Sequence, residues 1–301
     1  MLGAMDGELN YNSPKSIAQF LQTHGMAPNR RFGQNFLISQ AVRKKIVRLL
    51  DLEEQSKVWE VGPGLGAMTH MLVDKTENIT LFEIDKRFIQ FLTSLYSEYP
   101  HLKIVAGDVV KTWKSVYREE GLPDRIMGNL PYNTASMIIA DLIEAGCVAP
   151  QMVFTVQKEV AVRMRAAPGT REYSSFSVIC QFACTVEDGG TISPGAFYPP
   201  PHIDSALVIM KPHGRFKFSR LPLVSAITRA LFSSRRKTIR NTLIRSSLTT
   251  HYGEEKITAA LEAGGIDPGR RGEELTVEAI TALAEFLSET SSDSDKWNCW
   301  S

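Results

Sequence analysis

The stretch "GNLPYNTAS" at residues 128–136 ends an apolar run with a side-chain amide and an aromatic ring. Pro131, two residues after Asn129, stops strand pairing and stiffens the turn, so Asn129 and Tyr132 are predicted at the rim of a sheet. An amide that both accepts and donates hydrogen bonds, next to a flat ring, suits a flat ligand that carries an amine. An ordinary strand-to-helix turn, with Asn129 as the helix N-cap, is the competing interpretation.

A glycine-rich loop and two acids predict where a cofactor binds. Gly62, Gly64 and Gly66 in "EVGPGLG" follow an apolar strand, and we expect a helix to begin directly behind them. Glu83 ends the next strand, 21 residues after Gly62, and Asp108 ends the strand after that. A carboxylate at the first position can accept both ribose hydroxyls, which fits NAD or S-adenosylmethionine. The second acid suits the exocyclic amine of an adenine and favours S-adenosylmethionine.

The end of the fourth strand is where a methyl acceptor would meet the sulfonium of that cofactor. An adenine amine is a poor nucleophile because its lone pair is delocalised into the ring. If Asn129 and the Leu130 carbonyl each accept one N–H, the nitrogen becomes tetrahedral and its lone pair points at the methyl group, while Tyr132 stacks on the base. Orientation and preorganised acceptors then supply most of the rate, without a strongly shifted catalytic base.

Short β-type runs carry these residues, with amphipathic stretches between them. The runs span residues 56–61, 78–84, 102–107, 124–129 and 151–156. Strand alternating with helix at this spacing predicts an α/β fold with a mostly parallel sheet covered on both faces. Two later runs, at residues 184–192 and 205–211, are expected to pair antiparallel at one side of the sheet. From about residue 215 the pattern is helical and predicts a small second domain.

Basic residues are concentrated in one part of a chain whose net charge is only +1. Between Asp204 and Glu254 there is no acidic residue, and there are ten Lys or Arg. This predicts a polyanionic partner and favours nucleic acid over a solvated basic face. We predict one helix over residues 232–248, and pairing of its cations with acids such as Glu273 and Glu274 is the alternative. The candidate nucleic-acid contacts are Arg235, Arg236, Lys237 and Arg240.

The composition is that of a globular protein, because 301 residues with 43% hydrophobic content can bury one large core, or one large and one small. No run of about 18 apolar residues occurs, and the N-terminus lacks a basic region followed by an apolar stretch. We therefore expect neither a membrane span nor secretion. Four cysteines at no metal-ligand or disulfide spacing indicate reduced thiols, a cytoplasmic protein and no bound metal.

Several motifs form a specific combination along the chain. They are "RRFGQNFL" (30–37), "EVGPGLGAMT", "FEID", "GDV", "GNLPYN", "VQKEVAVRM" (156–164), "AFYPPPHIDSALV" (196–208), "FSSRRKTIRNTL" (232–243) and "GIDPGRRGEELTVE" (265–278). In this combination the chain resembles the ribosomal RNA adenine dimethyltransferases over about residues 28–287. The resemblance implies a Rossmann-like class I S-adenosylmethionine-dependent methyltransferase sheet of seven strands, one of them antiparallel, with a small C-terminal helical domain. Ser174 departs from the family, in which many members have glycine, and leaves the local loop shape open.

Carried over by position, the resemblance implies further roles for single residues. Asn35 and Leu37 would close over the cofactor, and Gly62 would lie under its amino-acid part. Glu83 would bind the ribose and Asp108 the adenine of the cofactor, and Asn129 would lie between cofactor and acceptor. Phe197 would be the second aromatic against the base, with core packing as its alternative.

The implied activity is transfer of methyl groups from S-adenosylmethionine to the N6 amines of two adjacent adenosines near the 3′ end of small-subunit (16S) ribosomal RNA. The products are dimethyladenosines and S-adenosylhomocysteine, and the expected setting is small-subunit biogenesis by a monomeric enzyme on the subunit or its precursor. Three alternatives stay open: a large-subunit ribosomal RNA adenine methyltransferase that confers antibiotic resistance, a nonenzymatic ribosome-assembly or nucleic-acid-binding factor, and a nicotinamide dehydrogenase.

The expected domains are an N-terminal extension (1–27), a methyltransferase domain (28–214), a helical RNA-contacting domain (215–288) and a disordered tail (289–301).

Overall fold

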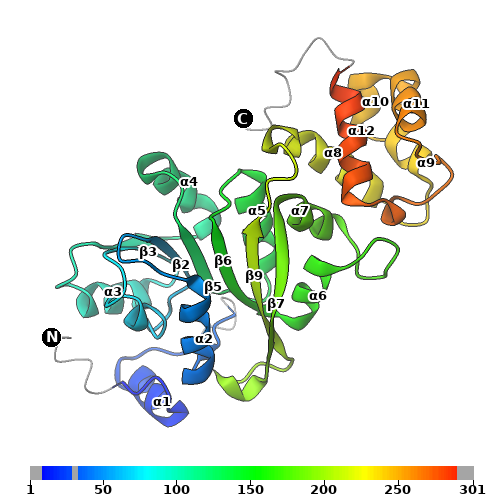
Figure 1. The fold of residues 1–301 in the computed structure, drawn as a ribbon. Helices are drawn as coiled ribbons and strands as arrows, with labels where there is room; N and C mark the ends of the chain where they lie inside the picture. The colour runs from blue at the N-terminus through cyan, green and yellow to red at the C-terminus, as the bar shows by residue number, and fades with distance from the viewer. Residues whose placement is uncertain (1–8, 29–32, 290–301) are drawn as a thin grey trace. The chain divides into compact units, whose positions relative to one another are not determined.

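The computed structural model describes residues 9–28 and 33–289 (Figure 1). By internal packing the chain divides into two compact units. Unit 1 comprises the described residues up to Asp141, together with Cys147–Ala161 and Glu187–Pro212. Unit 2 comprises Leu142–Gly146, Val162–Val186 and the described residues from His213 onward. The domain limits expected from the sequence stay a prediction, and Cys299 and nearly all of the expected tail lie outside the described residues.

A seven-stranded sheet organises unit 1, in the order β4-β3-β2-β5-β6-β9-β7. The strands are β2 (Lys57–Val61), β3 (Asn78–Glu83), β4 (Leu102–Ala106), β5 (Arg125–Asn129), β6 (Gln151–Gln157), β7 (Cys184–Ile192) and β9 (Ser205–Pro212). From β4 through to β6 the neighbours are parallel, and β9 runs antiparallel to β6. The predicted α/β fold with a mostly parallel sheet is confirmed, and the two later runs lie side by side at one edge (Figure 1).

The strand ends are fixed by acids that cap the helices after them. Asp85 and Asp108 are the N-caps of α3 (Lys86–Leu95) and α4 (Val109–Glu120), and each side chain accepts a backbone N–H in the first helical turn. The other helices that begin in unit 1 are α1 (Pro14–Thr23), α2 (Gln40–Leu50), α5 (Ala135–Glu144) and α6 (Lys158–Arg165). A two-stranded ribbon, β1 (Phe36–Leu37) antiparallel to β8 (Phe197–Tyr198), packs into the same core.

The glycine-rich segment differs from the expectation that an α-helix begins directly behind it. After β2 the chain forms turns, with only a short 3₁₀ helix at Thr69–Met71. Gly64 and Gly66 have φ values of 56° and 78°, which are left-handed conformations that break a helical path. A Cβ on Gly66 would lie 3.0 Å from the Tyr96 hydroxyl oxygen, so the loop also packs too closely for a side chain there.

Unit 2 is helical, as the sequence pattern predicts. Its helices are α7 (Ser175–Ala183), α8 (Leu221–Phe232), α9 (Ile239–Ile244), α10 (Ser247–Tyr252), α11 (Glu254–Ala263) and α12 (Val277–Glu289). Val224 and Ile227 of α8, with Ile280 and Leu283 of α12, are fully buried and form part of its core. None of the helices in the described part of the chain has the length and hydrophobicity needed to cross a bilayer.

The predicted single helix over residues 232–248 is wrong. Helix α8 ends at Phe232, a turn follows, and Thr238 caps α9 by accepting a hydrogen bond from Asn241 N. Ser233 Oγ donates to Ala230 O at 2.7 Å, and side-chain bonds of this kind compete with a continuous helix. As a result, Arg236 lies in the turn and does not share a helix face with Arg240.

Ser174, where the family pattern has glycine, fits the local backbone. It is the N-cap of α7, with an extended φ of −152° that any residue adopts. Its backbone N–H donates to Ser177 Oγ at 3.0 Å. No left-handed conformation is required at this position, so the departure from the family leaves the turn intact.

Candidate active site

A pocket opens at the carboxyl ends of β2, β3, β4 and β5, and all of its described lining residues belong to unit 1. The lining comes from within residues 33–37, 60–68, 82–84, 107–110 and 129–138. The six predicted cofactor-binding residues all line it: Asn35, Leu37, Gly62, Glu83, Asp108 and Asn129. Segments far apart in the sequence therefore meet at one edge of the sheet, as expected for parallel strands.

Glu83 is held almost entirely by backbone N–H groups. Its Oε1 accepts hydrogen bonds from Ile84 N at 2.8 Å and Asp85 N at 2.9 Å, and its Oε2 accepts one from Gly64 N at 3.0 Å. The side chain is buried, and this burial raises its pKa, while the three N–H donors act in the opposite direction. The carboxyl group links the end of β3 to the glycine loop, and its remaining lone pairs can accept hydroxyl groups of a ligand.

Asp108 has one oxygen engaged and one available. Its Oδ1 accepts a hydrogen bond from Val110 N at 3.1 Å and so caps α4. The other oxygen has no hydrogen-bond donor among the described residues, and the residue lines the pocket. It can therefore accept an N–H from a ligand without giving up the helix cap.

Glu60 is a pocket residue to which the sequence analysis assigned no role. It is 2% exposed, and its Oε2 accepts a hydrogen bond from Thr69 Oγ1 at 2.7 Å. Burial, opposed by the hydrogen bond from Thr69 and helped by the nearby charge of Glu83, raises the pKa of Glu60 to about 7. The position of Glu60 two residues before Gly62, at the end of the first strand, could have indicated a place in the pocket. Its burial depends on the tertiary fold and could not be predicted from the sequence.

The charges around the pocket select its ligand. Three acids, Glu60, Glu83 and Asp108, line it, and no Lys, Arg or His within residues 9–28 and 33–289 does. Apolar side chains, including Phe36, Ile84 and Val109, complete the walls. Such a lining is unfavourable for phosphate groups and can accept hydroxyl groups, an aromatic amine and a positive charge.

Asn129 lies at the end of β5 and is oriented by a backbone carbonyl. Its Nδ2 donates to Asn35 O at 2.6 Å, which assigns Oδ1 as the acceptor left for a ligand. The competing interpretation of Asn129 as a helix N-cap is not observed, because α5 begins only at Ala135. Asn35 and Asn129, both assigned to the cofactor site from the sequence, are thus joined by a direct hydrogen bond.

The other predicted catalytic residues, Leu130, Tyr132 and Phe197, do not line the pocket. The Leu130 side chain is buried, and no N–H among the described residues donates to its carbonyl oxygen. Tyr132 is partly buried, with its hydroxyl 2.5 Å from Ser205 Oγ, and burial raises its pKa. Phe197 is 2% exposed and pairs with Leu37 in the β1–β8 ribbon. Its ring belongs to the core in this structure, which is the alternative noted for it from the sequence.

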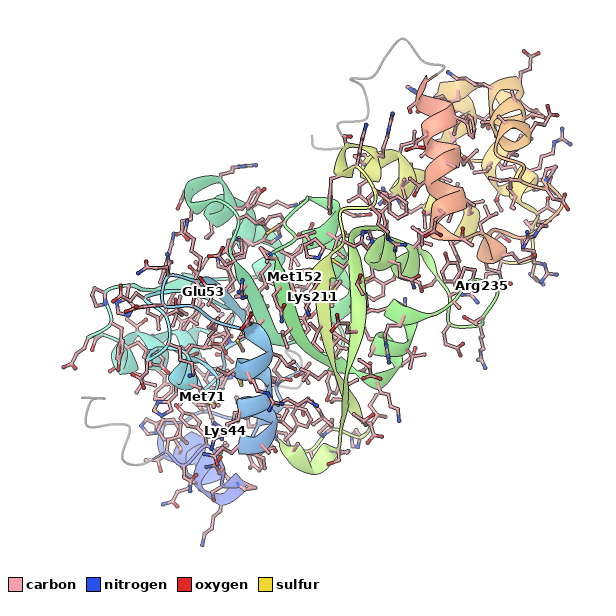
Figure 2. All side chains as sticks on the ribbon, in the orientation of Figure 1. Lys44, Glu53, Met71, Met152, Lys211 and Arg235 are labelled. Atoms are coloured by element: carbon pink, nitrogen blue, oxygen red, sulfur yellow. The ribbon has the colours of Figure 1, made fainter. Side chains whose placement is uncertain are left out.

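The four predicted nucleic-acid contacts, all in unit 2, divide into paired and unpaired cations. Arg235, which is labelled in Figure 2, lies 3.4 Å from Glu273 and donates to the carbonyls of Arg171 and Tyr173. Arg240 donates to Glu254 at 2.8 Å. Arg236 and Lys237 are exposed, and within the described residues they have no ion pair. Internal pairing with an acid is thus observed for Arg235, through Glu273, and for Arg240, through Glu254.

No cluster of His, Cys, Asp or Glu within residues 9–28 and 33–289 has the arrangement of a metal site. Cys147, Cys180 and Cys184 are buried free thiols, and burial raises the pKa of each. They are packing residues in the described structure.

Comparisons with known proteins agree with this architecture. The family model of the ribosomal RNA adenine dimethylases matches residues 25–289. The chain is 41% identical over 281 residues to "Ribosomal RNA small subunit methyltransferase A" of Treponema denticola, covering 92% of this chain and 96% of that protein. It is 34% identical to the protein of the same name in Halothermothrix orenii, covering 95% and 97%.

A solved structure has the same fold. A dimethyladenosine transferase from Plasmodium falciparum aligns with a TM-score of 0.66 at 23% identity, covering 81% of this chain and 94% of that one. The likeness at this identity concerns the fold, a class I methyltransferase sheet. Together with the family match over nearly the whole described chain, it leads to one conclusion: this chain belongs to the ribosomal RNA adenine dimethylase family.

Proposed function

We propose that this protein transfers methyl groups from S-adenosylmethionine to the N6 amines of two adjacent adenosines near the 3′ end of small-subunit ribosomal RNA. The observation that carries the proposal is the pairing of an acidic pocket with an amide held at its edge. Three acids, and no cation of the described chain, line the pocket, and Asn129 is oriented there by Asn35 O. Family membership supports the same reaction.

The residues present fit S-adenosylmethionine better than a dinucleotide. Glu83 would accept the ribose hydroxyls, and the unengaged oxygen of Asp108 would accept the adenine amine. Gly62 leaves room for the amino-acid part, with Asn35 and Leu37 closing over the ligand. Dinucleotide sites hold the pyrophosphate at the N-terminus of an α-helix behind the glycine loop. Here only a 3₁₀ helix at Thr69–Met71 follows the loop, which disfavours NAD. The bound sulfonium supplies an electrophilic methyl group.

The chain's own part in the reaction is to orient the target amine. Asn129 Oδ1 accepts one N–H of the base, because Nδ2 is already used on Asn35 O. The Leu130 carbonyl, which has no donor among the described residues, accepts the second N–H. Two acceptors in fixed positions draw the nitrogen toward tetrahedral geometry, and this preorganisation lowers the barrier without a shifted base.

Two aromatic residues are proposed to hold the base. Tyr132 stacks on it, and the hydrogen bond to Ser205 limits rotation of the Tyr132 ring. Phe197 would contact the base only by leaving its core position, so we assign the main stacking role to Tyr132.

The RNA contact is proposed for unit 2 residues 215–288, with residues 28–214 as the methyltransferase domain. Arg236 and Lys237 are the leading candidates because they are exposed and unpaired within the described residues. Arg235 and Arg240 would have to exchange an internal acid for a phosphate. The partner is the small ribosomal subunit or its precursor, and we propose a cytoplasmic monomer acting in subunit biogenesis.

Incubation with labelled S-adenosylmethionine and separately purified, undermethylated small and large subunits tests the proposal. Mapping of the modified nucleotides should give N6,N6-dimethyladenosine at two adjacent adenosines of the small-subunit RNA. Modification of the large subunit alone would support the antibiotic-resistance alternative. Tight subunit binding without methyl transfer at any concentration of cofactor would support a nonenzymatic assembly factor.

A further inference from the structure

Two carbonyl groups of the glycine loop (residues 62–68) lack a backbone partner. Gly66 O accepts a hydrogen bond from His70 N at 2.9 Å, as in a helical turn. On either side of it, Leu65 O and Ala67 O receive no backbone N–H from the described residues. Because the loop does not continue as an α-helix, these carbonyls need donors from elsewhere in unit 1.

Side chains from two other segments supply these donors. Tyr11 Oη donates to Leu65 O at 3.0 Å, and Arg43 Nη1 donates to Ala67 O at 3.2 Å. Arg43 also donates through Nη2 to Asn12 Oδ1, and its guanidinium carbon lies 5.8 Å from the centre of the Tyr11 ring. The segment before α1 and helix α2 therefore hold the loop together, although neither Tyr11 nor Arg43 lines the pocket.

The surroundings of Arg43 argue against a role in packing alone. Its side chain is 3% exposed, and it forms no ion pair with an acid in the described part of the chain. Its Nε is buried without a hydrogen-bond partner, and burial lowers the pKa of Arg43. Burial of a cation without a counter-charge opposes folding, and an apolar side chain would pack here at lower cost. The arginine is better explained by the two groups it holds.

We propose that Tyr11 and Arg43 are positioning residues of the cofactor site, which fix the glycine loop in the shape that receives S-adenosylmethionine. The family match begins at residue 25, so Tyr11 and Asn12 lie outside it. The segment that contains Tyr11 and Asn12 would then help to shape the cofactor site, although neither residue lines the pocket. The inference rests on the proposed binding of S-adenosylmethionine to this pocket.

Calorimetric titration with S-adenosylhomocysteine and with S-adenosylmethionine tests the inference. Tyr11→Phe removes one hydroxyl donor and should weaken binding about three- to tenfold, the range of a neutral hydrogen bond. Arg43→Met removes the donors to Ala67 O and Asn12 and should weaken it about tenfold or more. Arg43→Lys keeps the charge and one donor and should fall between Arg43→Met and the parent.

Controls separate this effect from general destabilisation. Arg48→Met changes an exposed arginine of the same helix, α2, on which Figure 2 labels Lys44. Tyr117→Phe removes a tyrosine hydroxyl on α4, far from the loop in sequence. All variants are compared at a temperature at which each is folded, and both controls should bind the cofactor like the parent.

Two further readouts distinguish positioning from a merely structural role. The KM for S-adenosylmethionine should rise in Tyr11→Phe and Arg43→Met while kcat and the KM for the ribosomal subunit change little. Amide hydrogen exchange of residues 64–68 should become faster in both variants, with the rest of the sheet unaffected. A lower melting temperature with unchanged cofactor affinity and unchanged loop exchange would overturn the inference. Failure of the parent protein to bind the cofactor would instead overturn the proposed function.

Discussion

The two sides of the pocket are held by different parts of the chain. On the side proposed for the cofactor, Glu83 and Asp108 together accept four backbone N–H groups. On the side proposed for the acceptor, each side chain has one hydrogen bond: Asn129 donates to Asn35 O, and the Tyr132 hydroxyl bonds with Ser205 Oγ. Backbone donors remain when most side chains change, so Glu83 and Asp108 should keep their positions when neighbours other than Tyr11 and Arg43 are substituted. The acceptor side depends on a few side chains and should be sensitive to single substitutions.

Asn129→Ala should have the largest effect, because it removes an acceptor aimed at the reacting amine. We expect turnover to fall about a hundredfold to a thousandfold, while RNA binding changes little. Single-turnover methylation of undermethylated small subunits measures this directly. Asn133→Ala, at an exposed position of the same pocket, is the matched control and should keep near-parent turnover. Parent-like methylation by a folded Asn129→Ala variant would contradict the orienting role.

The stability of the protein should depend on pH through Glu60, because burial raises its pKa to about 7. In the unfolded chain the group titrates near its ordinary value of 4.5. The folded state therefore binds more protons between these two values, and the free energy of unfolding falls as the pH rises through about 7. The full effect is about 3 kcal/mol, from the difference between the two pKa values.

Denaturant titrations at several pH values, between about 4.5 and 8, measure this dependence. Glu60→Gln keeps the shape of the side chain and removes the titration, so its stability should vary less with pH. Glu77→Gln, at an exposed position just before β3, serves as the control and should keep the parent slope. An identical pH profile for Glu60→Gln and the parent would show that the Glu60 carboxyl group is more hydrated than its 2% exposure indicates.

Glu83→Ala should weaken cofactor binding more than it lowers turnover at saturating cofactor. The loss of charge-assisted hydrogen bonds to the ribose, worth about 1.5–3 kcal/mol each, predicts about a ten- to hundredfold rise in Kd. Calorimetry with S-adenosylhomocysteine provides the measurement, and binding of NAD by the parent in place of the methyl donor would end the methyltransferase interpretation. If Glu83→Ala bound the cofactor normally but turned over slowly, Glu83 would act in the reaction step. The proposed division into a cofactor side and an acceptor side would then be wrong.

The contacts with RNA should lie outside the pocket, at Arg236 and Lys237 of unit 2, which have no ion pair among the described residues. The Arg236→Ala, Lys237→Ala double variant should weaken small-subunit binding and reduce the slope of log affinity against log salt by about one unit for each phosphate that is no longer neutralised. Cofactor affinity should stay at the parent value. Arg240→Ala is the internal comparison and should change the slope less, because Arg240 pairs with Glu254. An unchanged slope in the folded double variant would remove this turn from the RNA-binding surface.

The parts of the fold that follow local rules could be predicted from the sequence. Strand ends carrying Glu83, Asp108 and Asn129 were predicted because short apolar runs ending in a polar residue have few other interpretations. Their convergence on one pocket follows from the parallel arrangement of the strands. What the pattern could not give is the burial of Glu60, because it depends on packing around the strand.

The errors occurred where turns compete with helices. The glycine segment lacks the expected α-helix because Gly64 and Gly66 adopt left-handed conformations. The basic segment is broken at residues 233–238, where serine and threonine side chains bond to the backbone. In both places the apolar periodicity was real, but capping and backbone conformation decided the structure. The contacts that orient the site, such as Asn129 with Asn35 O and Tyr132 with Ser205, join residues too distant in sequence for any local pattern to predict.

The charge of the pocket lining also bears on inhibitor design. A wall with three acids, and with no Lys, Arg or His among its described residues, has no side-chain cation to pair with a phosphate. Nucleotide analogues with phosphates should be excluded, and uncharged thioether mimics lack the attraction offered to a positive centre. A competitive inhibitor suited to this wall would combine an adenosine-like core with an ammonium in place of the sulfonium. Compounds designed for phosphate-binding nucleotide sites carry negative charge, so this inhibitor would differ from them in the sign of its charge.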